Sequence, residues 1–358
     1  MAAAVESVNP NRSPEPAPRK PRPRRLWVAV SALVLAASAC GSGRPGAGGT
    51  HVRLAVGGAN QMVYLPTTLA QELGFYTDEG LDVELQDFAG GSKALEALVG
   101  GSADVVSGFY DHTIQMAADG RYLTAFVNML RFPGLVLVTS PQAAATVTRI
   151  EDLKGRVAGV TSAGSSSQML LTYLLQRHGV PPDSVSITAI GSAATAIAAV
   201  ERGKVDAGMM ADPAFTLMAL RTRGLRVLAD LRSADGVKQA FGTDTYPASV
   251  LYAPADWIAA HRDTTARLAR AMVKTLRWMH THTPEAIAHR TPKAFRGDDD
   301  TLYVEAVSNS MPMFSPDGVM DPAGADAVYR LLAQSMEKVR NARIDLSQTY
   351  TNDFVHGR

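Results

Sequence analysis

The sequence predicts a two-lobed α/β protein, and three observations support that fold class. Residues 94–105 and 196–207, about a hundred residues apart, each combine a short apolar-periodic helix, a glycine and a strand that begins at an aspartate. Apolar strands also alternate with helices, as in a mainly parallel sheet that is covered on both faces. Finally, about three hundred residues follow the N-terminal leader, more than one core usually organises. Two similar units therefore predict two similar lobes.

Residues 1–40 have the composition of an export signal. Basic residues precede an apolar run at 26–37, and small residues lead from there to Cys40. The run is shorter than the roughly 20 residues that span a bilayer. Residues 37–40, Ala-Ser-Ala-Cys, resemble the lipobox of bacterial lipoproteins, with Ala37 in place of the preferred leucine. The resemblance implies that Cys40, the only cysteine, is lipidated. A small-residue cleavage site that happens to contain a cysteine is the alternative.

Residues 41–50 are rich in glycine, so we expect a flexible tether between the leader and the folded part. The formal net charge of the chain is only +1, and lysine and arginine cluster in the leader alone. This distribution argues against nucleic acid as a partner.

The first half of the folded part is expected to alternate strands with helices. Gly74 ends the first helix, and the unit at 94–105 supplies the second helix and the third strand. The expected strands are 51–56, 81–88, a strand from Asp104, 123–127 and 135–138, and the expected helices are 65–73, 94–99 and 113–118.

The second half repeats this alternation and then becomes helical. Gly179 closes a helix, and Asp212-Pro213 opens another. From Asp256 onward we expect a helical tail that wraps the first lobe, with helix caps at Asp263 or Thr264, at Thr283 and at Asp321. The expected strands are 156–160, 185–190, a strand ending at 209–210, 227–229 and 249–252, and the expected helices before the tail are 167–177, the helix of the unit at 196–207 and the helix after Pro213.

Four motifs in order resemble the solute-binding proteins of bacterial ABC importers, in the group of nitrate, sulfonate, taurine and thiamine-precursor binders (NMT1/THI5-like). The motifs are residues 74–84, the unit at 94–105, residues 150–160, and the unit at 196–207 with Asp212-Pro213. The resemblance implies a type II periplasmic-binding fold, in which two α/β lobes are joined by two crossing strands and enclose the ligand. It also implies a permease and an ATPase as partners.

On this basis we expect an extracytoplasmic, lipid-anchored monomer that delivers a small solute to a permease. The expected organisation is an export signal at 1–40, a tether at 41–50, lobe 1 at 51–138, lobe 2 at 139–247, and a return to lobe 1 at 248–358. An envelope sensor that uses the same cleft is the alternative.

The ligand is expected to contact the loops that follow the strands, because ligands of α/β sheets lie beyond the carboxyl ends of the strands. Residues 161–166 form the most ligand-like turn, since hydroxyls and free N–H groups at a helix start can hold an oxyanion or a carbonyl. A flexible Ser/Gly surface loop is the alternative reading of that turn. The candidate ligand-binding residues are Asn60, Gln61, Tyr64, Gly91, Ser92, Phe109, Asp111, His112, Thr161, Ser162, Gly164, Ser165, Ser166, Asp212 and Tyr246.

The sequence leaves the charge of the solute open. Helix N-termini and hydroxyls favour a sulfonate, nitrate or carboxylate. Asp111 and Asp212 favour an amine or an aminopyrimidine edge, because a carboxylate in a closed cleft needs a cation or a donor. Lys93 and Arg131 could offset the two carboxylates, and Asp212 before a proline is equally well read as a helix cap.

We expect no enzyme, no cofactor and no metal. The sequence has no Gly-x-Ser-x-Gly elbow, His-Glu-x-x-His pair or Walker loop. His280, His282 and His289 do not share one helical face. The group resembled includes a relative that makes a thiamine pyrimidine from its own histidine, and His112 is the candidate for that role here. The export signal argues against this enzymatic alternative.

Overall fold

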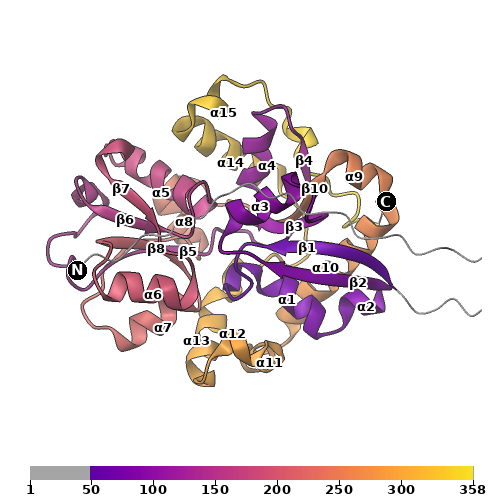
Figure 1. Cartoon of the computed structure of the whole chain (residues 1–358), viewed down its shortest axis with the longest axis horizontal. Coiled ribbons are helices and arrows are strands. Elements are labelled where there is room, and N and C mark those ends of the chain that lie inside the picture. Colours follow the sequence, from indigo (N-terminus) through magenta and orange to yellow (C-terminus); the bar gives the residue numbers. More distant parts are fainter. Residues whose placement is uncertain (1–48, 358) are drawn as a thin grey trace, which may run out of the picture. The chain divides into compact units, whose positions relative to one another are not determined.

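The computed structural model describes residues 49–357, and these residues form two five-stranded sheets (Figure 1). The first sheet has the strand order β2-β1-β3-β10-β4, and the second has the order β7-β6-β8-β5-β9. The strands are β1 Thr50–Val56, β2 Leu81–Asp87, β3 Val105–Phe109, β4 Leu123–Asn128, β5 Leu135–Thr139, β6 Val157–Val160, β7 Ser186–Ala189, β8 Ala207–Ala211, β9 Val227–Asp230 and β10 Ser249–Pro254. The expected signal, Cys40 and most of the tether lie outside the described residues.

The two sheets have the same topology. In each, four strands run in one direction and one strand, β10 or β5, runs against its two neighbours. These reversed strands are the ones by which the chain enters each sheet from the other. The expected two-lobed, mainly parallel α/β fold is therefore confirmed. Because β5 pairs with β8 and β9, the chain leaves the first sheet before Leu135, and the expected boundary at residue 138 is too late.

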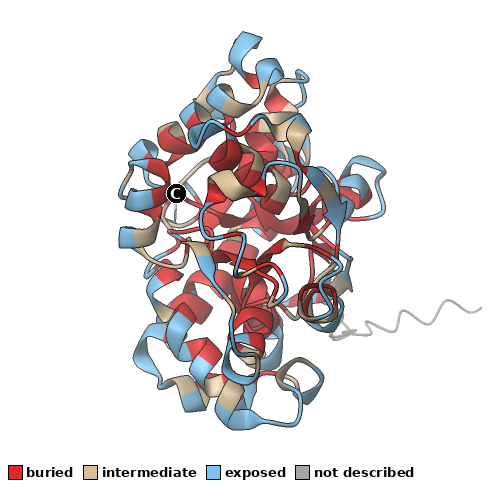
Figure 2. Ribbon diagram, turned by 90° about the vertical axis from the view of Figure 1, so that its left-hand side faces the viewer, coloured by how far each residue is buried: buried red, intermediate tan, exposed pale blue. Residues whose placement is uncertain are grey.

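Helices cover both faces of each sheet, so strands β3, β5 and β8 are buried along their whole length (Figures 1 and 2). Such double burial explains why these strands are apolar without alternation. The helices of the two lobes are α1 Leu65–Glu72, α2 Phe75–Asp78, α3 Gly91–Val99, α4 Asp111–Ala117, α5 Ser166–Arg177, α6 Ala193–Glu201, α7 Ala214–Arg221 and α8 Ala234–Phe241.

The repeated sequence unit has the same structural role in both lobes. Gly101 and Gly203 follow helices α3 and α6 with φ values of 76° and 64°, which is the left-handed conformation expected of a helix stop. The aspartate that follows joins the start of the next strand, β3 or β8, to the neighbouring parallel strand, β1 or β6. Asp104 accepts from the Arg53 N–H at 2.9 Å, and Asp206 accepts from the Val157 N–H at 2.8 Å.

The C-terminal helices contact both lobes, which corrects the expectation that the tail wraps lobe 1 alone. Helix α10 (Arg262–Thr281) packs on α1 and α2, whereas α13 (Asp300–Ser310) packs on α7 and α14 (Pro322–Ser335) packs on both α4 and α5. The remaining helices are α9 Ala255–Ala260, α11 Pro284–Arg290, α12 Lys293–Arg296 and α15 Glu337–Asn341. Every helix between residues 49 and 357 is too short or too polar to cross a bilayer.

Two of the three expected caps in the tail are confirmed. Thr283 and Asp321 accept hydrogen bonds from the first-turn N–H groups of α11 and α14. The cap expected at Asp263 or Thr264 is wrong, because α10 begins at Arg262 and its N-cap is His261. Asp263 instead lies in the first turn and pairs with Arg267 at 2.7 Å.

Candidate functional site

Loops at the carboxyl ends of the strands bring the two lobes into direct contact. The Ser92 hydroxyl, at the start of α3, lies 2.8 Å from the Ser162 hydroxyl and donates to the Ala163 carbonyl at 2.8 Å. The Met62 N–H of the first lobe donates to the Asp212 carbonyl of the second at 2.8 Å. The structure is therefore a closed conformation.

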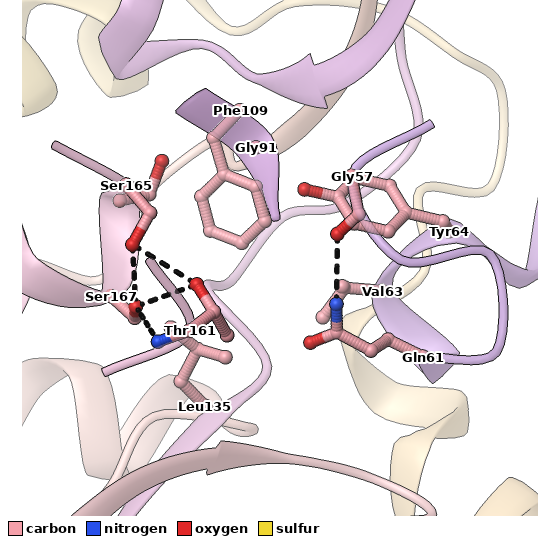
Figure 3. Close-up of a pocket in the computed structure, with 11 residues that line it drawn as sticks. Gly57, Gln61, Val63, Tyr64, Gly91, Phe109, Leu135, Thr161, Ser165 and Ser167 are labelled. Atoms are coloured by element: carbon pink, nitrogen blue, oxygen red, sulfur yellow. Dashed lines mark hydrogen bonds between the residues drawn. The ribbon is translucent and has the colours of Figure 1, made fainter. Parts of the chain in front are cut away.

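A cavity of about 20 Å³ lies between the lobes, large enough for about one water molecule (Figure 3). Tyr64 and Phe109 form an aromatic wall, with their rings edge to face at 6.2 Å. In Figure 3, Tyr64 and Gln61 lie on one side of the cavity, opposite Thr161, Ser165 and Ser167. The lining residues are Gly57, Gln61, Val63, Tyr64, Gly91, Phe109, Leu135, Thr161, Ser165, Ser166 and Ser167.

Three hydroxyls form a triangle at the N-terminus of α5. The Thr161 hydroxyl lies 3.0 Å from those of Ser165 and Ser167, which are 2.8 Å apart. Ser167 also accepts from the Thr161 N–H at 3.0 Å. A hydroxyl can rotate from one partner to another, and the first N–H groups of a helix have no intrahelical acceptor. The three hydroxyls and the first N–H groups of α5 can therefore donate hydrogen bonds to a polar group in the cavity.

Asp111 and His112 lie behind the cavity in the first turn of α4, and both are fully buried. The Ser166 hydroxyl donates to Asp111 Oδ1 at 2.7 Å across the two lobes, whereas Asp111 Oδ2 has no partner among the described residues. His112 Nδ1 lies 3.5 Å from the Tyr252 hydroxyl, and no acceptor or donor of ordinary geometry faces Nε2 in the described structure. Asp111 and His112 therefore each keep one buried polar atom without a hydrogen-bond partner among the described residues.

Burial acts on the two titratable groups in opposite directions. It raises the pKa of Asp111, although the neighbouring His112 and the Ser166 hydroxyl lower it. Burial lowers the pKa of His112, although Asp111 and the backbone of Gly164 raise it. Both shifts disfavour the charged forms. The absent side chain of Gly91 leaves room for the imidazole, since a Cβ there would lie 3.0 Å from His112 Cε1.

Asp212 has a saturated carboxylate. It pairs with Arg232 at 2.9 Å and accepts from the Thr216 N–H at 3.0 Å and from the Ser310 hydroxyl at 3.3 Å. Arg232 also pairs with Asp230 at 2.6 Å. Asp212 lines a second small cavity next to the first, but its charge is balanced within the protein. Its backbone carbonyl, rather than its side chain, contacts the first lobe.

The structure distributes the expected ligand residues over four environments. Gln61, Tyr64, Gly91, Phe109, Thr161, Ser165 and Ser166 line the first cavity, and Asn60 and Asp212 line the second together with Gln61 and Thr161. Ser92 and Ser162 form a hydrogen bond between the lobes. Gly164 lies in the turn between Ser162 and α5. Asp111, His112 and Tyr246 are buried and line neither cavity.

Sequence reasoning missed several lining residues, including Leu135 and Ser167. Leu135 was assigned to the wrong lobe, and Ser167 lies inside a predicted helix with no distinguishing signal. Neither proposed counter-cation lines the cavities. Lys93 pairs with Glu96 at 2.7 Å, and Arg131 donates to the Pro312 carbonyl at 2.9 Å.

Comparison with known proteins identifies related chains. The family model described as NMT1/THI5 like matches residues 61–286. YtlA of Bacillus subtilis, named only as a binding protein, is 22% identical over 289 residues, covering 78% of this chain and 80% of YtlA. A 4-amino-5-hydroxymethyl-2-methylpyrimidine phosphate synthase of Schizosaccharomyces pombe is 27% identical, but over only 41% of this chain and 40% of the enzyme.

Solved structures share the fold over nearly the whole described part. A protein of Bordetella bronchiseptica superposes with a TM-score of 0.81 at 36% identity, covering 86% of this chain and 96% of that one. The alkanesulfonate-binding protein SsuA of Xanthomonas axonopodis, bound to MOPS, gives a TM-score of 0.66 at 16% identity, covering 85% and 98%.

Proposed function

This chain belongs to the NMT1/THI5-like family, and from that premise we propose that it captures a small polar solute outside the cytoplasm for an ABC importer. It has the periplasmic-binding-protein fold. The observation that carries the proposal is the cavity enclosed between loops of two lobes that hydrogen-bond directly to each other. In this conformation the cavity has room for about one water molecule, so a solute enters when the lobes separate, and the lobes then close around it less tightly than they do here. The solute favours closure by the free energy with which it binds the closed form better than the open form.

The closed form then serves as the signal to a permease and its ATPase. Lipidation of Cys40 tethers this monomeric domain to the outer face of the cell membrane, close to the permease. The spacing of basic, apolar and small residues in the leader supports the anchor. An envelope sensor on the same fold is the alternative, and the neighbouring genes discriminate: a permease and an ATPase favour import, whereas a receptor kinase or cyclase favours sensing.

The site supports binding rather than catalysis. The similarity to the pyrimidine synthase covers less than half of either chain, and His112, the candidate for self-modification, is fully buried beneath the cavity wall. Mass spectrometry of the purified protein tests whether the chain is an enzyme that modifies itself. A change in the mass of the His112 side chain would support the enzymatic alternative.

A solute screen tests the proposal. Protein without residues 1–40 is screened by thermal shift against sulfonates, nitrate, carboxylates, pyrimidines and amines, and each hit is examined by small-angle scattering. We expect at least one solute to raise the melting temperature and to reduce the radius of gyration. A hit that binds without any compaction would contradict capture by closure.

A further inference from the structure

We propose that the solute carries a nitrogen cation with N–H donors, which pairs with the carboxylate of Asp111 at the back of the cavity. This inference rests on the proposed function and specifies the chemical class of its solute. It separates this chain from SsuA, whose structure holds MOPS, a sulfonate.

The side chains that line the two cavities offer no positive charge. Within the described part of the chain, the residues that line the first cavity are all uncharged, and Asp212 is the one charged residue that lines the second. Asp212 shares Arg232 with Asp230, so this cluster has no positive charge to spare for a solute. An anionic solute would therefore meet hydroxyls and N–H groups but no side-chain cation in either lining.

The carboxylate of Asp111 is buried and only partly paired. Its side chain is fully buried, and among the residues that the structure describes its only side-chain partner is the Ser166 hydroxyl. Oδ2 is buried without a partner among residues 49–357. Burying the ionised form with this oxygen unpaired is costly, and burial accordingly raises the pKa of Asp111. A donor that brings a positive charge stabilises the ionised form most completely. An anion placed at the cavity would instead add repulsion in a region of low dielectric constant.

The described groups next to Asp111 do not act as its counterion. Burial lowers the pKa of His112, so the imidazole beside Asp111 is neutral at neutral pH. Burial first, and the nearby charge of Asp111 as a smaller cause, raise the pKa of Tyr64, Tyr246 and Tyr252 further above the usual range, so these hydroxyls stay neutral. Among the described groups around Asp111, none therefore supplies a positive charge.

A solute can reach the carboxylate of Asp111 from the cavity. Ser166 both lines the cavity and donates to Asp111 Oδ1, so a solute N–H that displaces the Ser166 hydroxyl reaches Oδ1 from the cavity itself. The positive charge of the solute then also offsets the charge on the unpaired Oδ2 of the same carboxylate. The Ser166 hydroxyl can then rotate toward the hydroxyl triangle. The aromatic wall of Tyr64 and Phe109 offers ring surfaces that attract a cation.

Calorimetry with solutes of matched shape tests the proposal. The probes are acetamidinium, acetamide and acetate, and the larger set benzamidinium, benzamide and benzoate. In the wild-type protein we expect the cation of at least one set to bind more tightly than its neutral and anionic counterparts. Asp111→Asn keeps the shape of the side chain but removes its charge, and we expect it to weaken the binding of that cation by about tenfold or more.

The control is Asp82→Asn, which removes an exposed carboxylate paired with His51 at 2.9 Å and changes the net charge by the same amount. It should leave cation binding unchanged. Cation affinity should also fall as the pH falls through the pKa of Asp111, and this pH dependence should disappear in Asp111→Asn. Thermal unfolding checks that both variants are folded.

Three outcomes would overturn the proposal: no probe cation binds, the anion or amide binds at least as tightly, or the cation binds Asp111→Asn as tightly as wild type. These results are distinguishable from failure of the proposed function. If an anion binds and compacts the protein, the proposed cationic solute is refuted but capture of a solute by closure still holds. If solutes bind without compacting the protein, capture by closure itself is refuted.

Discussion

Gly90 provides a way to obstruct closure without altering either lobe. The residue precedes α3 with φ at 171°, an extended conformation that alanine adopts without strain. A Cβ at this position would lie 2.4 Å from the Ser162 hydroxyl oxygen and 3.1 Å from the Ser162 Cβ, both in the other lobe. Gly90→Ala therefore introduces a clash that exists only when the lobes are closed.

The expected magnitude follows from the cost of overpacking. Forcing one extra methyl group into a packed contact costs about 1–3 kcal/mol, which corresponds to an affinity loss of roughly 5- to 150-fold. The assay is calorimetric titration of Gly90→Ala with whichever solute the screen identifies. Small-angle scattering of Gly90→Ala without solute should show that both lobes remain folded.

Ser162→Gly supplies the matched control, because it removes the atoms that the new methyl group would meet. Ser162→Gly alone should weaken binding modestly through loss of the Ser92 hydrogen bond. The double variant should then bind as well as Ser162→Gly alone. Wild-type affinity in Gly90→Ala, or no relief in the double variant, would refute the closed contact.

Three further changes probe other parts of the molecule. Arg232→Ala should lower the free energy of unfolding in urea by about 3–5 kcal/mol, because it leaves the buried carboxylate of Asp212 without its cation; Asp212→Asn with Arg232→Met should recover most of the loss. Burial lowers the pKa of His112, so below about pH 6.5 the unfolded imidazole binds a proton that the folded one does not. The free energy of unfolding of the wild type should therefore fall with pH there, by up to about 1.4 kcal/mol per pH unit. His112→Gln should remove this loss. Cys40→Ser should move the protein from the membrane fraction to the soluble fraction of cells.

Each of these expectations can fail in a defined way. A single Arg232→Ala variant as stable as wild type would mean that Asp212 is not charged and buried in solution. Asp111 works against His112 in the pH profile, since its raised pKa favours the folded state as the pH falls. The difference between wild type and His112→Gln isolates the histidine, and parallel profiles would contradict its burial. Unchanged membrane association of Cys40→Ser would contradict the lipid anchor.

The local pattern of the sequence was enough to locate most strands and helices. The repeated unit ends its helix at a left-handed glycine in both lobes, and the aspartate after it has the same strand-joining role, so similar sequence reflects similar packing. The loops after the strands were also found, because polar and glycine residues at strand ends are visible without tertiary information.

Contacts between distant segments could not be predicted. The chain leaves the first sheet before Leu135, but β5 is apolar in the same way as the strands of either sheet, so its pairing had no local signal. The pairing of Asp212 with Arg232 had no local signal either, because it joins segments that are not neighbours in the sequence. The tail contacts both lobes because α14 packs on α4 and α5 together, which depends on the arrangement of the lobes rather than on its own periodicity.

A distance measurement between the lobes tests solute-driven closure most directly. Val99 in α3 and Leu220 in α7 are exposed, at 47% and 49%, and Cys40→Ser removes the native cysteine. Spin labels at Val99→Cys and Leu220→Cys then report the separation of the two lobes by pulsed electron paramagnetic resonance. We expect a saturating solute to convert a broad distribution into a single shorter distance. An identical distribution with and without a solute that calorimetry shows to be bound would contradict closure around the solute.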